Sequence, residues 1–173
     1  MKPRFKPKIG WQELKVLFTK NKFAVQRFEK AFAKKFQAVD AVAFPYGRSA
    51  QWAFINAVGL KDMDIIMPAY TCSVVAHAVA LSGNHPKFID INLSDFNMDL
   101  EKVEAAINPN TRAIIATHTF GYPQDLDQLE AIVKRAEDRY GHKVWLIQDC
   151  CHAFGAEYKG RRVGSLSDIN TFI

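Results

Sequence analysis

Short apolar runs alternate with amphipathic segments along the chain from residue 38 onward. Five runs of strand length are rich in Val, Ile and Phe and contain no internal proline: Ala41–Phe44, Asp64–Met67, Lys87–Ile91, Arg112–Thr117 and Val144–Ile147. Runs of this length and composition favour β-strands. Because they are apolar throughout instead of alternating, we expect strands that are covered on both faces.

The segments between these runs have the apolar spacing of helices: residues 49–60, 71–83, 97–111 and 125–141. Candidate N-caps are Thr71 and either Asn97 or Asp99, and glycines at 83 and 141 are candidate helix ends. Strands that alternate with helices of this length predict an α/β fold, with a mostly parallel sheet and helices on both faces.

Length and composition set the broad class. With 173 residues, 49% hydrophobic and 24% charged, the chain is typical of one globular domain with a sizeable core. No apolar stretch is long enough to span a bilayer, and no charged start leads into a signal-type apolar region. We therefore expect a cytoplasmic protein with no membrane span. Three cysteines, two of them adjacent, suggest no disulfide framework.

Positive charge is concentrated at the N-terminus. Residues 1–35 contain eleven Lys and Arg against Glu13 and Glu29, while the rest of the chain is slightly acidic. One interpretation is an arm that binds nucleic acid or an anionic membrane. We favour the solvated face of N-terminal helices, whose other side carries an apolar stripe that includes Phe23, Phe28 and Phe36. No nucleic-acid-binding signature is present, so we expect a basic arm over residues 1–22 and no nucleic-acid partner.

Candidate chemistry follows the strands, because ligands of parallel sheets bind beyond the strands' carboxyl ends. After the first run, "YGRSAQWAF" passes through Gly47 into a helix, and free N–H groups at a helix start suit a phosphate. Arg48 could add a charged contact and Ser49 a hydroxyl. An ordinary strand–helix turn is the alternative. Neither a dinucleotide-binding glycine fingerprint nor a P-loop is present.

The stretch "DCCHAFG" follows the fifth run. Adjacent Cys150 and Cys151 lack the spaced pairing of a zinc site, and no second pair exists elsewhere. A catalytic cysteine would need a lowered pKa and a base, whereas a cysteine after an apolar strand is more often inert packing. We therefore predict neither a metal site nor a cysteine nucleophile here.

The partner of Asp149 must also be identified, because a carboxylate after a buried strand needs a cationic or strong donor partner. Arg161, Arg162 or a backbone turn could serve. The alternative is a ligand cation such as a protonated pyridine nitrogen, which needs a fixed anion. His152 could touch the same ring or be a turn histidine. The stretch 159–162, "KGRR", predicts a hairpin turn with solvated charges.

Assembled, these motifs resemble the N-terminal part of the nucleotide-sugar aminotransferases of the DegT/StrS type, which are pyridoxal-phosphate enzymes of fold type I. The correspondence runs from about Val25 to Ile173. It includes "VQRFEKAFAKKF" as the opening helix, "GRSAQWAFINAVGL" as the phosphate-binding turn and helix, the block that begins "DIIMPAYTCSVVAHAVALSG", then "THTFGYPQDLDQLEAI" and "IQDCCHAFGAEYKGRRVGSLSDINTF".

The resemblance implies roles for five residues toward pyridoxal 5'-phosphate. Asp149 matches the acid that keeps the pyridine nitrogen protonated, and His152 matches a residue beside the ring and its phenolic oxygen. Arg48 and Ser49 occupy the phosphate-binding turn, where the family more often has Thr-Ala. Cys72 stands where relatives commonly carry an aromatic residue that stacks on the ring, a role that nearby Tyr70 could take over.

The resemblance also implies an activity, and this sequence differs from the family's pattern at one residue that the activity requires. Family members transfer an amino group, with glutamate as the expected donor, to a nucleotide-linked keto-sugar, and they work as homodimers. No lysine here matches the family's Schiff-base lysine, so we expect residues 23–173 to be an incomplete large domain that is inactive alone. Two alternatives stay open: a sugar dehydratase of the same family, in which histidine replaces the lysine, and a non-catalytic fragment with a partner-binding basic arm.

Overall fold

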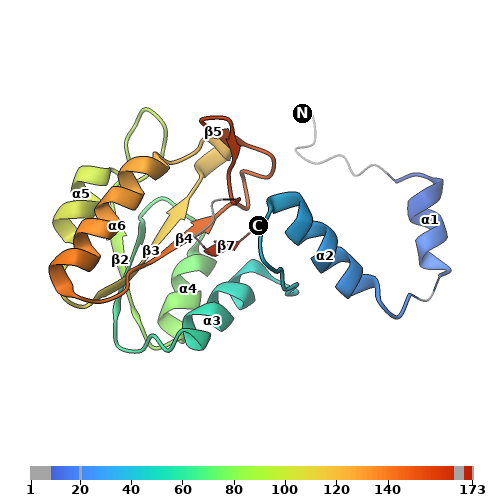
Figure 1. Ribbon diagram of the computed structural model, residues 1–173, viewed down its shortest axis with the longest axis horizontal. Coiled ribbons are helices and arrows are strands. Elements are labelled where there is room, and N and C mark those ends of the chain that lie inside the picture. The colour runs from blue at the N-terminus through green and yellow to red at the C-terminus, as the bar shows by residue number, and fades with distance from the viewer. Residues whose placement is uncertain (1–8, 20, 166–169, 173) are drawn as a thin grey trace.

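Five parallel strands form the central sheet of the computed structural model, which describes residues 9–19, 21–165 and 170–172. The strand order is β2-β1-β3-β4-β7 (Figure 1). The bounds are β1 Asp64–Pro68, β2 His85–Ile89, β3 Thr111–Thr117, β4 Trp145–Asp149 and β7 Asn170–Phe172. The expected α/β fold with a mostly parallel sheet is confirmed.

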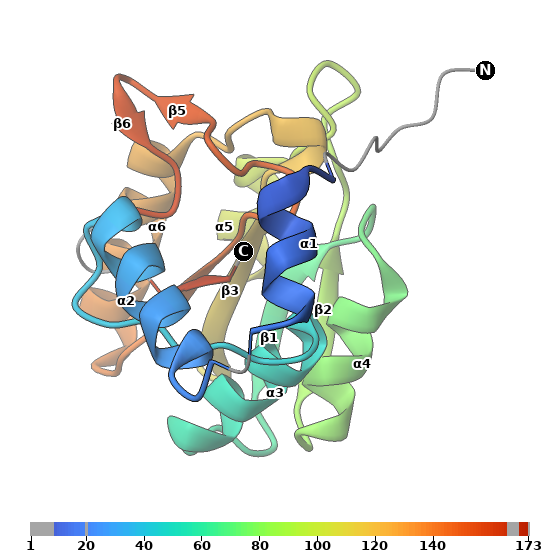
Figure 2. The same cartoon turned by 90° about the vertical axis from the view of Figure 1, so that its right-hand side faces the viewer.

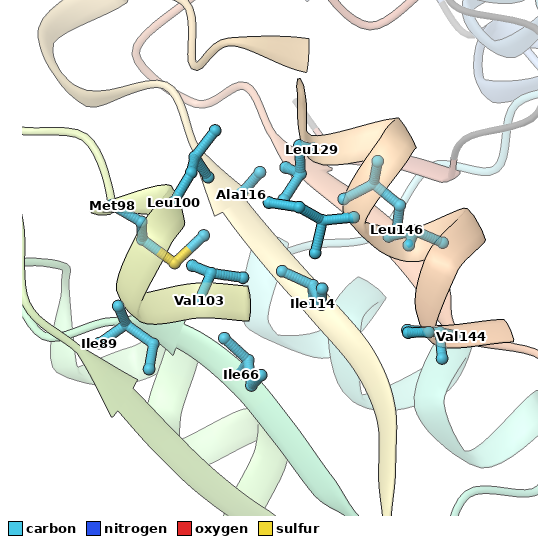
Figure 3. Packing of buried hydrophobic residues seen from close by; sticks show 13 residues of the cluster. Ile66, Ile89, Met98, Leu100, Val103, Ile114, Ala116, Leu129, Val144 and Leu146 are labelled. Atoms are coloured by element: carbon cyan, nitrogen blue, oxygen red, sulfur yellow. The ribbon is translucent and has the colours of Figure 1, made fainter. Parts of the chain in front are cut away.

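Helices cover both faces of this sheet. One face carries α3 (Gly47–Ala57) and α4 (Ser73–Leu81), and the other carries α5 (Leu100–Ala106) and α6 (Leu126–Tyr140). Neighbouring residues of β1 point to opposite sides, as strand geometry requires: Ile65 packs with α3 and α4, whereas Ile66 packs with α5 and α6 (Figure 3). Every residue of β1 is therefore buried, as its uninterrupted apolar run predicted.

The helix ends follow local chemistry. Asp99 caps α5, accepting hydrogen bonds from the backbone N–H groups of Glu101 and Lys102, so this candidate cap is confirmed. Helix α6 ends at Gly141, whose positive φ of 69° suits glycine. The expected cap at Thr71 is wrong: α4 starts at Ser73 after Cys72, with no side-chain cap bond.

Strand β2 begins and ends two residues earlier than predicted and contains Pro86. It pairs only with β1 among the described strands, so it is an edge strand, where a missing backbone N–H is tolerated. The prediction of a proline-free strand from Lys87 to Ile91 was therefore wrong in its bounds.

The predicted strand Ala41–Phe44 is wrong. These residues have no regular secondary structure and lie outside the described sheet. Side chains satisfy their backbone instead: the Ala41 N–H donates to Asp40 and the Ala43 N–H to Glu29. A run of apolar residues becomes a strand only where a neighbouring strand can pair with it, and sequence pattern does not report that neighbour.

Two N-terminal helices, α1 (Trp11–Leu17) and α2 (Ala24–Phe36), lie to one side of the sheet (Figures 1 and 2). The apolar stripe of α2 is only partly covered. Phe36 is buried and stacks with Phe32, and both contact Phe154, while Phe23 and Phe28 are more than half exposed.

The hairpin prediction is confirmed. Strands β5 (Glu157–Tyr158) and β6 (Arg161–Arg162) are antiparallel, and both turn residues, Lys159 and Gly160, have positive φ as in a type I′ turn. The expectation that its charges are simply solvated is wrong. Lys159 and Arg161 form ion pairs with Asp127 on α6, and Arg162 donates to the Lys35 carbonyl of α2.

Within the residues that the structure describes, no helix has both the length and the apolar character that crossing a membrane requires.

Candidate functional site

A cavity of about 580 Å³ opens at the carboxyl ends of β1, β3 and β4, beside the first turns of α3 and α4. Its volume is in the range of small-molecule sites. Four of the five residues singled out from the sequence line it: Arg48, Cys72, Asp149 and His152. The fifth, Ser49, lies next to it on α3 but is not part of the lining; its N–H donates to the Tyr46 carbonyl.

Asp149 ends β4 and is 5% exposed. One carboxylate oxygen accepts a hydrogen bond from the Cys151 N–H at 3.1 Å, so the backbone-turn partner considered from sequence is present. The arginine partners are not: among the described residues no cationic side chain pairs with Asp149, and Arg161 and Arg162 bind elsewhere. A buried carboxylate therefore faces a ligand-sized cavity with its charge uncompensated by the described side chains.

Three residues that line the cavity each carry a buried polar atom with no hydrogen-bond partner among the described residues: Gln51 Oε1, Thr117 Oγ1 and Thr119 Oγ1. Gln51 and Thr119 are 3% and 4% exposed. A buried polar atom that lacks a partner costs about 1–3 kcal/mol. These atoms are therefore suited to hydrogen-bond a polar ligand.

Helix α3 presents its N-terminus to the cavity. Ser49 and Ala50 donate to the Tyr46 carbonyl, whereas the N–H groups of Gly47 and Arg48 have no partner in the described part of the chain. The Arg48 guanidinium lies over the Tyr46 ring, 4.6 Å from its centroid. Two free N–H groups, the helix dipole and an arginine together suit an anion such as a phosphate.

His152 is placed by the turn that follows β3. Its ring lies parallel to Phe120, with an interplanar angle of 4° and centroids 6.2 Å apart. Phe120 and Gly121 both have positive φ, and a Cβ on Gly121 would meet the His152 carbonyl oxygen at 3.0 Å. Glycine at 121 therefore allows the turn to approach the His152 backbone closely.

His118 anchors the same turn from inside the protein. It is fully buried; its Nδ1 accepts from the Gln124 N–H, so Nε2 carries the proton and donates to Gln148 Oε1 at 3.0 Å. Burial is the main cause that lowers the pKa of His118 below its usual value, partly offset by Gln148 and by Asp149. His118 is thus a neutral positioning residue.

The adjacent Cys150 and Cys151 show no sign of a nucleophile. Burial, reinforced by the charge of Asp149, raises the pKa of Cys151 to about 12 and raises that of Cys150 further. Both are thiols at neutral pH, and a thiol is a weak nucleophile. No cluster of His, Cys, Asp or Glu in the described residues is arranged to hold a metal ion.

Sequence reasoning missed Gln51, Thr117, Thr119 and Phe120. Gln51 had a signal, because it is a polar residue one turn before Ile55 on the buried face of α3. The two threonines flank His118 at the end of β3 but look like ordinary strand residues. Nothing in the sequence indicated that Phe120 would stack on His152.

The chain is similar to proteins of a known family. Residues 15–173 match the family model for the DegT/DnrJ/EryC1/StrS aminotransferase family. GDP-perosamine synthase of Escherichia coli O157:H7 is 33% identical over 149 residues, which are 86% of this chain and 39% of that protein.

Two solved structures extend the comparison. The aminotransferase from Psychrobacter cryohalolentis superposes with a TM-score of 0.80 at 27% identity, covering 91% of this chain and 41% of that one. A variant of GDP-4-keto-6-deoxymannose-3-dehydratase with bound GDP-perosamine gives 0.71 at 28% identity, covering 79% and 36%.

The chain belongs to the DegT/DnrJ/EryC1/StrS aminotransferase family. Its fold is that of the N-terminal part of a fold type I large domain. The chain spans about two fifths of the length of the relatives it matches.

The family implies pyridoxal phosphate, and the residues around the cavity fit it. Asp149 could offer its carboxylate to a pyridinium N–H, and the start of α3 could offer donors to a phosphate. The unpartnered Gln51 and Thr117 atoms offer hydrogen bonds to the polar groups of the ring. No described residue that lines the cavity is a lysine.

Proposed function

We propose that this chain contributes the cofactor-binding part of a pyridoxal-phosphate-dependent aminotransferase. The enzyme would transfer an amino group, with glutamate as donor, to a keto-sugar carried on a nucleotide. The observation that carries the proposal is Asp149: a buried carboxylate at the end of a central strand, beside a ligand-sized cavity, with no ion pair among the described residues. Family membership supports the same assignment.

Each group at the cavity has a definable task in this proposal. Asp149 accepts a hydrogen bond from the protonated pyridine nitrogen and holds the proton there. The N–H groups of Gly47 and Arg48 bind the phosphate, and His152 flanks the ring. With its nitrogen protonated, pyridoxal phosphate supplies an electron sink for the substrate's α-carbon. The lysine that joins the cofactor covalently is not among the described lining residues, so we propose that this chain binds the cofactor without performing transamination.

A dehydratase is the second candidate. A 28% identical dehydratase structure shares the fold with a TM-score of 0.71, and the cavity described here serves either chemistry. In this proposal both activities would use the same cofactor-binding wall. They differ at the residue in the position of the family's lysine, which separates aminotransferase from dehydratase.

Titration of the chain with pyridoxal phosphate, followed by equilibrium dialysis, tests the proposal. Asp149→Asn keeps the shape and the acceptor for the Cys151 N–H but removes the charge. Because a charge-assisted hydrogen bond is worth about 1.5–3 kcal/mol, we expect the Kd to rise roughly tenfold or more. Asp138→Asn, an exposed carboxylate on α6, is the matched control. Equal affinity in wild type and Asp149→Asn would overturn the proposal.

A further inference from the structure

A second cavity of about 300 Å³ adjoins the first and is lined by residues 94–96 and 119–122. Thr119 and Phe120 line both cavities. The two cavities are therefore adjacent. Nothing in the cofactor assignment uses this second space.

Aromatic rings form its wall. Phe96 and Phe120 line this cavity and contact each other, with ring centroids 5.7 Å apart, and they are 39% and 62% exposed. Tyr70, which lines the first cavity, contacts both rings. Phe96 and Phe120 both have positive φ, 61° and 55°. Such a backbone is strained for a bulky residue and tends to occur at ligand sites.

Hydrogen bonds of a buried asparagine fix the positions of Phe96 and Phe120. Asn97 is 1% exposed; its Oδ1 accepts from the Thr119 N–H, and its Nδ2 donates to the Tyr122 carbonyl. The loop that carries Phe96 is thereby tied to the turn that carries Phe120. Exposed rings on a fixed frame form a preorganised surface on which a flat group can stack.

The charge of the second cavity indicates which kind of flat group it can bind. The only charged side chain among the described lining residues is Asp95, whose Oδ1 also accepts the Asn97 N–H at 2.9 Å. A carboxylate repels phosphates and accepts hydrogen bonds, so this cavity suits an uncharged group that carries N–H donors.

We infer that the second cavity binds the nucleobase of the nucleotide-sugar, with the base stacked on Phe96 and Phe120 and its ring N–H donated to Asp95. The inference rests on the proposed function, because it assumes a nucleotide-linked substrate. Guanine and uracil carry a ring N–H beside a carbonyl and match the carboxylate. Adenine and cytosine lack that ring N–H and match it poorly.

Calorimetric titration of the full chain with GDP, UDP, ADP and CDP tests the inference. GDP or UDP should bind at least fivefold more tightly than ADP and CDP. Phe96→Leu should weaken binding of the preferred nucleotide about five- to hundredfold, because stacking on one ring is lost. Asp95→Asn keeps the acceptor for Asn97 and should reduce the preference for GDP or UDP.

Phe88→Leu is the control, since Phe88 is 55% exposed on β2 and lines neither cavity; its nucleotide affinity should equal that of wild type. Thermal melts verify that each variant folds. Equal affinity for all four nucleotides, no binding of any, or an unchanged Kd in Phe96→Leu would overturn the inference. Pyridoxal phosphate titrated into the same samples separates the two proposals: binding of pyridoxal phosphate without nucleotide selectivity contradicts this inference alone.

Discussion

At the scale of single residues, Asp149 carries the argument for function. Its carboxylate is 5% exposed, accepts a hydrogen bond from the Cys151 N–H, and forms no ion pair with a described side chain. Burying a charge without a counterion costs free energy. A protein that gained nothing from this charge would be expected to pair it with an arginine or replace it. Arg161 and Arg162 follow closely in sequence, yet they bind Asp127 and the Lys35 carbonyl.

Gly121 gives a prediction at the same scale. Gly121→Ala should destabilise the protein by about 2–4 kcal/mol, because it adds both a left-handed alanine and a Cβ 3.0 Å from the His152 carbonyl oxygen. Gly59→Ala is the matched control: its φ is 74°, but its Cβ would meet nothing within 4 Å. It should cost about 1–2 kcal/mol. Urea denaturation of both variants measures the difference; equal losses would mean that the contact with His152 is unimportant.

At the scale of elements, the connection between β3 and α6 is built on a buried neutral histidine. Burial lowers the pKa of His118 in the folded state. In the unfolded chain a histidine binds a proton below about pH 6.5. As pH falls through that value the unfolded state gains a proton that the folded state does not bind, so stability decreases.

The free energy of unfolding should therefore decrease from pH 7.5 to pH 5.5, by up to about 1.4 kcal/mol per pH unit from this group. Urea denaturation at the two pH values measures this change. His118→Gln should be less stable at pH 7.5 but lose less on acidification. His77→Gln, an exposed position on α4, should keep the wild-type pH dependence. The same acid sensitivity in His118→Gln as in wild type would rule out His118 as its source.

How far the sequence could predict these elements depended on whether their determinants were local. The helix caps at Asp99 and Gly141 depend on hydrogen bonds to residues only a few positions away. The burial of β1 could be predicted from its own uninterrupted apolar run. The failure at Ala41–Phe44 has a non-local cause, because pairing requires a neighbouring strand. Strand β2 includes Pro86, which its edge position allows and which the predicted run Lys87–Ile91 left out.

The candidate site shows the same difference between features with local causes and features with non-local causes. Asp149 and Arg48 could be singled out because charged residues after apolar runs are conspicuous in a sequence. Thr117 and Gln51 could not be assigned, since their significance lies in polar atoms that the folded protein leaves without described partners. The pairing of Phe120 with His152 joins residues 32 positions apart through a strained turn that has no sequence signature.

At the scale of the whole molecule, the sheet and its four covering helices place both cavities beyond the carboxyl ends of the strands. The helices α1 and α2 lie to the side (Figure 1), with Trp11, Phe18 and Phe23 largely exposed. A homodimer is typical of the family. The chain spans about two fifths of its relatives' length. Within that span lies the cavity wall that runs from the start of α3 to Asp149 at the end of β4.

The ¹⁵N chemical shift of pyridoxal phosphate, labelled at its ring nitrogen and bound to the chain, tests the central claim most directly. It is measured at a pH where the ring nitrogen of the free cofactor is unprotonated. The account predicts a pyridinium shift in wild type and a neutral pyridine shift in Asp149→Asn. A neutral pyridine shift in the wild-type complex would contradict it.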